Sequence, residues 1–343
     1  MLSFYNQFIK RYDRSTLYLL CGIIFCISYT ALVFFLKPYL PELNFSEDTG
    51  FAHYYWKLPD PNFWTHFTAW TGYFFHQLSV WYIIYLAQSA HLTNSKRSHK
   101  INFIALFINA FFVLLHLIHT HVWYDGLAQD VHILSSQGAV IILLVIVLIM
   151  ENQRRGIVFG KKINFISEAG HALRKYHGYI FSWAVIYTFW YHPMETTVGH
   201  LIGTFYTCMI MLQGCLMYTR IHSNKFWTFF LEICVVFHGA TVAMMQQNGL
   251  WGMFLFGFLS IFIITQMHGL GLSKRIRWFF VGLYTFSAIF AYNNFFQGSM
   301  FAEIPRIPAV EYGLVFLFSF LIWFFIRLTA FLSKSENKKN YVK

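Results

Sequence analysis

Long apolar segments alternate with short polar ones along the entire chain. Ten of these segments are long enough, as α-helices, to cross about 30 Å of hydrocarbon. They lie at 17–36, 65–92, 101–123, 132–150, 177–192, 199–219, 226–246, 250–269, 278–297 and 309–331. The segment at 177–192 is the shortest, and it reaches full length only with the amphipathic stretch that begins at Glu168. The pattern predicts an all-α, polytopic membrane bundle of about ten transmembrane helices.

Composition supports the same class. Hydrophobic residues make up 57% of the 343 residues and charged residues only 11%, whereas about 25% of residues are charged in a typical soluble domain. All five cysteines fall inside the predicted spans, so no disulfide framework is expected. We predict a single transmembrane domain over 1–343, with an outer loop at 37–64 and a polar, basic inner loop at 151–176.

The positions of the basic residues predict the orientation. If the N-terminus is cytoplasmic, all 25 lysines and arginines except Lys37, Lys57 and Arg306 lie on the cytoplasmic side. This distribution satisfies the positive-inside rule and places both termini in the cytoplasm. Topology thereby explains the net charge of +11, and the inner loops are short connectors, so no nucleic-acid partner is expected. The lipid bilayer is the expected partner, and a bacterial cell (inner) membrane is the expected location.

Sixteen histidines carry the candidate chemistry. Uncharged imidazole is costly in hydrocarbon unless a partner binds it. The densest group lies at the predicted outer side, in HLIHTHVW, in the loop after it and in HPMETTVGH. We predict that this group holds zinc or non-haem iron. Its candidate ligands are His116, His119, His121, His132, His192 and His200.

Helical geometry constrains this metal site. His116 and His119 share one face of a helix, whereas His121 points about 140° away from His116, so all three can bind one ion only if the helix ends soon afterwards. Asp130 and Glu195, at the same depth, are candidate catalytic bases for a metal-bound water. HxxHxH matches neither the zinc-peptidase motif nor the histidine boxes of membrane desaturases. Interfacial histidines that bind only water and headgroups are the open alternative.

A second set of histidines lies deeper and at the inner ends of the segments. His76 and His238 are near mid-segment, and each has a second histidine, His91 or His222, 15 or 16 residues away. Such a spacing covers about 22 to 24 Å of helix, which suits two haems stacked across a bilayer. Haem b is therefore the alternative cofactor. Its candidate ligands are His76, His91, His177, His238 and His268.

These paired histidines, with RKYHGY around His177 and the His-Pro pair at His192, resemble membrane b-type cytochromes of the ferric reductase and cytochrome b561 kind. The resemblance covers the three segments from 177 to 246. It implies haem ligation by histidine pairs and electron transfer through the membrane. The chain departs from those families in its ten predicted spans and in histidine separations that are one or two residues longer.

Glu232 is the carboxylate that lies well inside a predicted span. It is a candidate proton relay, and the alternative is that it reaches back toward Arg220 or Lys225 at the interface. It lies about 120° around the helix from His238, so the two side chains are not natural partners.

Three functions remain open from the sequence. The leading one is a membrane oxidoreductase that uses haem b or non-haem metal and acts on a lipid, quinone-like or other apolar substrate. The chain has no flavin or nicotinamide domain, so electrons would come from a quinol or from an electron-donor protein. A metal-ion or proton-coupled transporter is the second possibility, although the spans look continuous. The third is a non-catalytic assembly subunit. Hydrolase, ATPase and thiol-redox functions lack their usual motifs.

Overall fold

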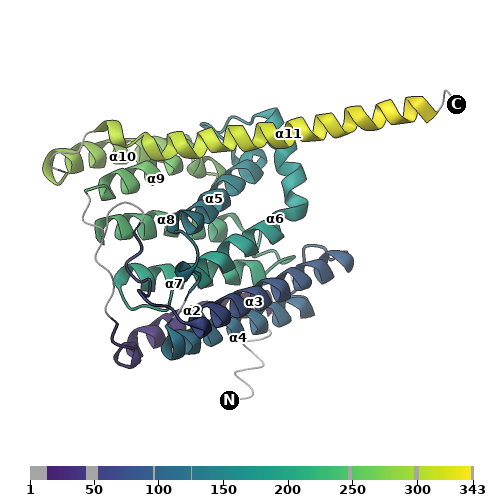
Figure 1. Cartoon of the computed structure of the whole chain (residues 1–343). Coiled ribbons are helices and arrows are strands. Elements are labelled where there is room, and N and C mark those ends of the chain that lie inside the picture. The colour runs from purple at the N-terminus through teal and green to yellow at the C-terminus, as the bar shows by residue number, and fades with distance from the viewer. Residues whose placement is uncertain are drawn as a thin grey trace, which may run out of the picture. The chain divides into compact units, whose positions relative to one another are not determined.

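The computed structural model describes residues 14–43, 53–95, 97–124, 126–245, 249–296 and 301–340, with side chains up to Leu332. In these residues the protein is built from helices and contains no strands (Figure 1). The ten α-helices are α2 (Arg14–Phe35), α3 (Phe63–Ser89), α4 (Lys100–Trp123), α5 (Ile133–Arg155), α6 (Asn164–Tyr191), α7 (Val198–Cys215), α8 (Lys225–Met245), α9 (Trp251–Ile264), α10 (Lys274–Asn294) and α11 (Arg306–Asn340).

Each helix coincides with one of the ten apolar segments, so the all-α prediction is confirmed. Seven helical segments of the described chain are long and apolar enough to cross a membrane. These are α2, α4, α5, α7, α8, the segment Trp251–Gly269 formed by α9 and η3 (Gln266–Gly269), and the segment Phe301–Leu332. They indicate a multi-pass membrane protein.

The other three helices, α3, α6 and α10, do not reach that apolarity. Polar side chains such as His76 and Gln77 interrupt α3. The first half of α6 is charged and polar, and α10 begins with a basic turn. The prediction of ten spans is therefore supported for seven segments.

The predicted inner loop at 151–176 is mostly helical. α5 continues to Arg155 and α6 begins at Asn164, so the connection is only 156–163. Asn152 is fully buried, and its side-chain amide donates to the carbonyl of Ile163 at 2.9 Å and to Ser167 Oγ at 2.8 Å. These hydrogen bonds connect the end of α5 to the start of α6. The polar residues at 151–176 therefore belong mostly to two helices and not to a long loop.

The packing divides the chain into two compact units. Unit 1 consists of residues 1–140 and 178–245, and unit 2 consists of residues 141–177 and 246–343. In unit 1, α3 packs on α4, and α7 packs on α2, α4 and α8. In unit 2, α9 packs on α10 and α11. The single domain over 1–343 stays a prediction.

The core of unit 2 is aliphatic around the connection between α5 and α6. Its fully buried members include Val145, Ile157, Ile166 and Val315. Gly156 ends α5 in a left-handed conformation with φ of +72°. A Cβ atom there would lie 2.4 Å from the carbonyl carbon of Gly160. The tight turn therefore requires glycine for both its backbone angle and its space.

We expect Gly156→Ala to lower the free energy of unfolding by about 2 kcal/mol or more, because it adds a strained φ and a backbone clash. Thermal unfolding of the detergent-purified protein measures this change. Gly138→Ala, within α5, is the control, since a Cβ at Gly138 meets nothing within 4 Å. That control should be neutral or stabilising by about 0.5–1 kcal/mol. Equal losses in both variants would contradict the assignment.

Candidate functional site

Five polar side chains from distant parts of unit 1 meet in one group, which we call the Tyr54 cluster. Tyr54 precedes α3, Tyr124 follows the end of α4, His192 and Glu195 lie between α6 and α7, and His200 is in the first turn of α7. Tyr54 and Tyr124 are almost completely buried, with 8% and 2% of their surface exposed. The structure therefore brings together the predicted residues His192, Glu195 and His200.

Local sequence explains how the connection between α6 and α7 presents these groups. Pro193 has no N–H to donate, so α6 ends at Tyr191 and His192 leaves the helix. Thr197 then caps α7, because its hydroxyl accepts from the backbone N–H of His200. The same hydroxyl lies 2.8 Å from His200 Nδ1. One threonine thus starts the helix and orients the imidazole.

Two imidazole nitrogens converge on the phenol oxygen of Tyr54. Tyr54 Oη lies 2.8 Å from His192 Nδ1 and 3.2 Å from His200 Nε2. One consistent proton assignment has His200 Nε2–H donating to the phenol oxygen and the phenol O–H donating to His192 Nδ1. Trp56 covers the group, with its ring edge-on to His200 at 4.3 Å between centroids.

Tyr124 and Glu195 form a second hydrogen-bonded pair in the cluster. The Tyr124 hydroxyl donates to Glu195 Oε1, and the backbone N–H of Thr196 donates to Glu195 Oε2 at 3.2 Å. Burial, and then the nearby Glu195 carboxylate, raise the pKa of Tyr124. Burial also raises the pKa of Tyr54 well above its usual value. Both phenols therefore carry their protons at neutral pH.

Two residues of α4 form hydrogen bonds with the backbone of the connection that carries His192 and Glu195. His116 is fully buried, and its Nε2–H donates to the backbone carbonyl of His192 at 2.9 Å. Thr120, one turn later, accepts from the backbone N–H of Met194 at 3.1 Å. His116 therefore positions the connection between α6 and α7 through the backbone.

A deeper layer centres on His76 in α3. Its Nδ1 accepts from the indole N–H of Trp190 at 3.1 Å, and its Nε2–H donates to Asn109 Oδ1 at 3.1 Å. Phe112 stacks on the ring at 4.6 Å between centroids. Both nitrogens of His76 are used within the protein, so this arrangement leaves neither of them for a haem iron.

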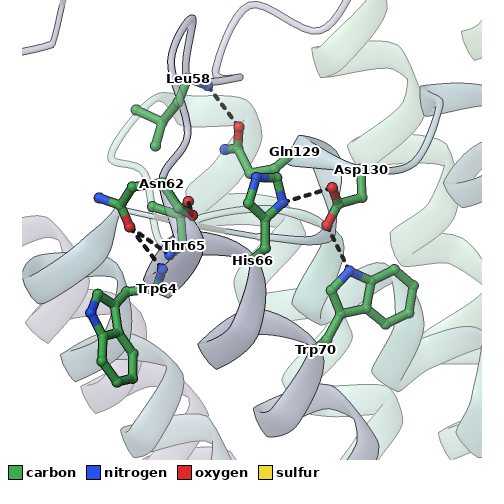
Figure 2. Close-up of polar contacts among 8 residues, drawn as sticks. All are labelled: Leu58, Asn62, Trp64, Thr65, His66, Trp70, Gln129 and Asp130. Carbon is green, nitrogen blue, oxygen red and sulfur yellow. Dashed lines mark hydrogen bonds and ion pairs between the residues drawn. The ribbon is translucent and has the colours of Figure 1, made fainter.

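Asp130 lies in a separate contact group at the start of α3. His66 Nδ1 is 2.7 Å from one carboxylate oxygen of Asp130, and Trp70 Nε1 donates to the other at 2.7 Å (Figure 2). In the same view Asn62 caps α3 by accepting from the backbone of Trp64 and Thr65. Asp130 therefore binds to α3 through His66, which the sequence reasoning did not single out.

The remaining outer histidines have local partners. His119 Nε2 is 2.8 Å from Thr68 Oγ1. His121 turns away from His116, as helical geometry predicts, and its ring nitrogens face the carbonyls of Leu117 at 2.8 Å and Leu36 at 3.3 Å. His132 is exposed, and its Nδ1 accepts from the backbone of Leu134. The HxxHxH motif therefore sends its three imidazoles to different partners.

The inner candidates for haem each have a different local contact. His91, in unit 1, is exposed just after α3, in a left-handed conformation. His177 and His268 belong to unit 2, where His177 contacts the carbonyl of Arg174 at 2.7 Å and His268 lies 3.0 Å from Arg277.

Two further candidates, His238 and Glu232, lie on α8. His238 sits over Gly203 of α7, where a Cβ atom would come within 2.9 Å of the ring, and its Nδ1 has no hydrogen-bond partner in the described residues. It is close enough to His192 and His200 to affect them electrostatically. Glu232 similarly interacts with Tyr206 of α7.

In the described residues, no three histidine, cysteine, aspartate or glutamate side chains are arranged to hold one metal ion. The Tyr54 cluster instead combines two imidazoles with a phenol, a residue type that the sequence reasoning did not consider as a ligand. The sequence feature that could have drawn attention to Tyr54 is its position in the aromatic segment at 37–64, in a run of aromatic residues beside His53.

Comparisons with protein-family models, with curated proteins and with solved structures found no match to this chain. The resemblance to b-type cytochromes therefore rests on the sequence motifs around His177 and His192 and has no support from a family match.

We expect His76→Leu to lower the free energy of unfolding by about 1–3 kcal/mol, because it strands the buried indole N–H of Trp190 and the amide oxygen of Asn109. Unfolding in detergent, followed by tryptophan fluorescence, measures the loss. His91→Asn, at an exposed position just after the same helix, is the control, because asparagine tolerates the left-handed backbone there; it should change stability by no more than about 0.5 kcal/mol. If both variants behaved alike, the deep hydrogen bonds would not be stabilising.

Proposed function

We propose that this protein is a membrane-bound oxidoreductase whose site is the Tyr54 cluster, with a non-haem transition-metal ion held by Tyr54, His192 and His200. The observation that carries the proposal is the convergence of two imidazole nitrogens, from different elements, on one phenol oxygen. Neutral imidazoles and a phenolate are suitable ligands for iron or copper, and for zinc where no redox change is needed.

The spacing of these atoms supports a metal site. Ligand atoms bound at roughly 2.1 Å and at right angles to one another lie about 3 Å apart. Tyr54 Oη is 2.8 Å from His192 Nδ1 and 3.2 Å from His200 Nε2, which is close to that separation. An ion could therefore enter with small movements of the three side chains. Binding would release the phenol proton, so the affinity for metal should rise with pH.

Glu195 is the proposed proton acceptor of the site. Its carboxylate is held by the Tyr124 hydroxyl and by the backbone of Thr196, which fixes its position beside the cluster. The metal ion, when bound, would take up the electron that a quinol loses on oxidation, and Glu195 would accept the proton released with it. Tyr124 would then stabilise the negative charge on Glu195 before it takes a proton.

An apolar substrate, such as a lipid or a quinone-like molecule, is the proposed reactant. Large aromatic side chains close to Tyr54 along the chain are exposed, among them Tyr55, Phe63 and Trp64. They offer an apolar approach to the cluster from the surface. Electrons would come from a quinol or from a donor protein, because the chain contains no recognisable flavin or nicotinamide domain.

The proposed location is a bacterial cell (inner) membrane, with both termini in the cytoplasm and the Tyr54 cluster near the opposite face. Seven apolar helical segments support a membrane location. The one-sided distribution of lysine and arginine, with all ten predicted spans crossing the membrane, supports this orientation.

The first test is metal analysis and visible spectroscopy of the full-length protein purified in detergent. We expect about one transition-metal ion per chain. If the ion is ferric iron, a tyrosinate-to-iron charge-transfer band should also appear. Tyr54→Phe should abolish that band and weaken metal binding at least about tenfold, because it removes one ligand oxygen while keeping the ring. His200→Gln should also weaken binding.

Matched variants make the test specific. Tyr55→Phe changes the exposed neighbouring phenol, and His132→Gln changes an exposed histidine outside the cluster, so both should retain metal. Metal that persists in Tyr54→Phe and His200→Gln would place the ion elsewhere. A Soret band with split reduced α and β bands would overturn the non-haem site in favour of haem b.

A non-catalytic assembly role is the second candidate. It is favoured by the deep layer, where His76 uses both nitrogens to join α3 to α4 and α6. A purified protein with neither metal nor haem, and with normal stability, would support this function over the first.

A further inference from the structure

A basic pocket of about 370 Å³ opens between the starts of α2 and α4, both in unit 1. Its volume falls in the range of about 300–1,000 Å³ that is usual for small-ligand sites. Arg14 and Tyr18 come from α2, and the α4 side is formed by Ser98, His99, Lys100, Phe103 and Ile104. Among the described residues, no acidic side chain lines the pocket, and none of the lining residues belongs to the Tyr54 cluster.

The electrostatics of this pocket favour an anion. Neither Arg14 nor Lys100 forms an ion pair with an acidic residue in the part of the chain that the structure describes. α4 begins at Lys100 with no acidic residue in its first turn. Because the N-terminal end of a helix carries partial positive charge, a lysine there is unfavourable until an anion compensates it.

The apolar side of the pocket points to a lipid. Phe103 and Ile104 line it and are 59% and 46% exposed. Phe107 and Phe111 follow at helical spacing on α4 and are exposed as well. They continue the face of Phe103 along the helix. A molecule with a phosphate at the pocket and acyl chains along this stripe would satisfy both the cations and the apolar surface.

We propose that this pocket binds the phosphate headgroup of an anionic phospholipid, in the leaflet that the positive-inside rule assigns to the cytoplasm. Arg14 and Lys100 bind the phosphate, and Phe103, Phe107 and Phe111 contact the acyl chains. Free phosphate has the same charge chemistry but would leave the aromatic stripe without a ligand. This inference is independent of the function proposed for the Tyr54 cluster.

Native mass spectrometry of the delipidated full-length protein tests the proposal, with titrations of phosphatidylglycerol, phosphatidylcholine and inorganic phosphate. The wild type should bind phosphatidylglycerol more tightly than phosphatidylcholine. The double variant Arg14→Gln, Lys100→Gln should bind phosphatidylglycerol on the order of tenfold more weakly, because it removes both charged contacts. The charge-conserving double variant Arg14→Lys, Lys100→Arg should restore binding, which separates charge from folding.

Lys274→Gln is the matched control, since Lys274 is also the first residue of a helix but does not line the pocket. It should bind phosphatidylglycerol like the wild type. Equal phosphatidylglycerol binding in the wild type and in the Arg14, Lys100 double variant would overturn the proposal. Saturation by inorganic phosphate that displaces phosphatidylglycerol without any effect of Phe107→Ala would reduce the site to a free-anion site and also overturn it.

Discussion

The hydrogen bond from the Trp190 indole to His76 is the contact on which the centre of unit 1 depends. A polar group in an apolar bundle has few partners, so each one that is buried must be satisfied by another helix. Gly72 makes this bond possible, because a Cβ atom there would lie 2.1 Å from the Trp190 ring. The indole, fully buried, then lies against His116 at 4.3 Å between centroids. Packing and hydrogen bonding thus fix α3, α4 and α6 at one point.

The position of the Tyr54 cluster depends on this contact between Trp190 and His116. His116, held against Trp190, donates to the carbonyl of His192, and so sets where the chain leaves α6. The histidines of unit 1 consequently divide into two kinds. His76 uses both ring nitrogens to join helices, whereas His192 Nδ1 and His200 Nε2 face one phenol oxygen, that of Tyr54. The second kind is the one on which the proposed metal site rests.

Much of the fold could be predicted from hydropathy, because apolar length determines where helices form in such a chain. The length of α6 could be predicted only in part, from the amphipathic stretch that begins at Glu168. Its start at Asn164 carries no hydropathy signal and lies beside the hydrogen bonds from Asn152 to Ile163 and Ser167. Within the site, His192, Glu195 and His200 were predictable together because one short connection carries them. Tyr54 lies 138 residues from His192, and only tertiary packing brings it there.

Asp130 was also predicted to lie in the site, but the structure places it in a different contact group. Its depth along the chain matched that of the outer histidines, yet its carboxylate turns to His66 and Trp70 on α3. Depth in a bundle is a one-dimensional quantity and does not specify which helices are neighbours. The packing of α3 against both α4 and η2 (Leu127–Gln129), whose three residues are buried, places Asp130 beside α3.

Several helices of this protein begin with a lysine, which is unfavourable at a helix N-terminus. α4, α8 and α10 start with Lys100, Lys225 and Lys274, at helix ends that the orientation predicted from the positive-inside rule assigns to the cytoplasm. The helix dipole opposes this placement, because the N-terminal end is already positive. Asn224 and Ser273 cap α8 and α10 through their side chains, but no acidic residue lies in the first turn of α4, α8 or α10. In the proposed orientation, the phosphates of an anionic membrane surface would compensate these lysines. The pocket brings Arg14 of α2 and Lys100 of α4 together. Two cations would therefore share one lipid phosphate there, as we propose.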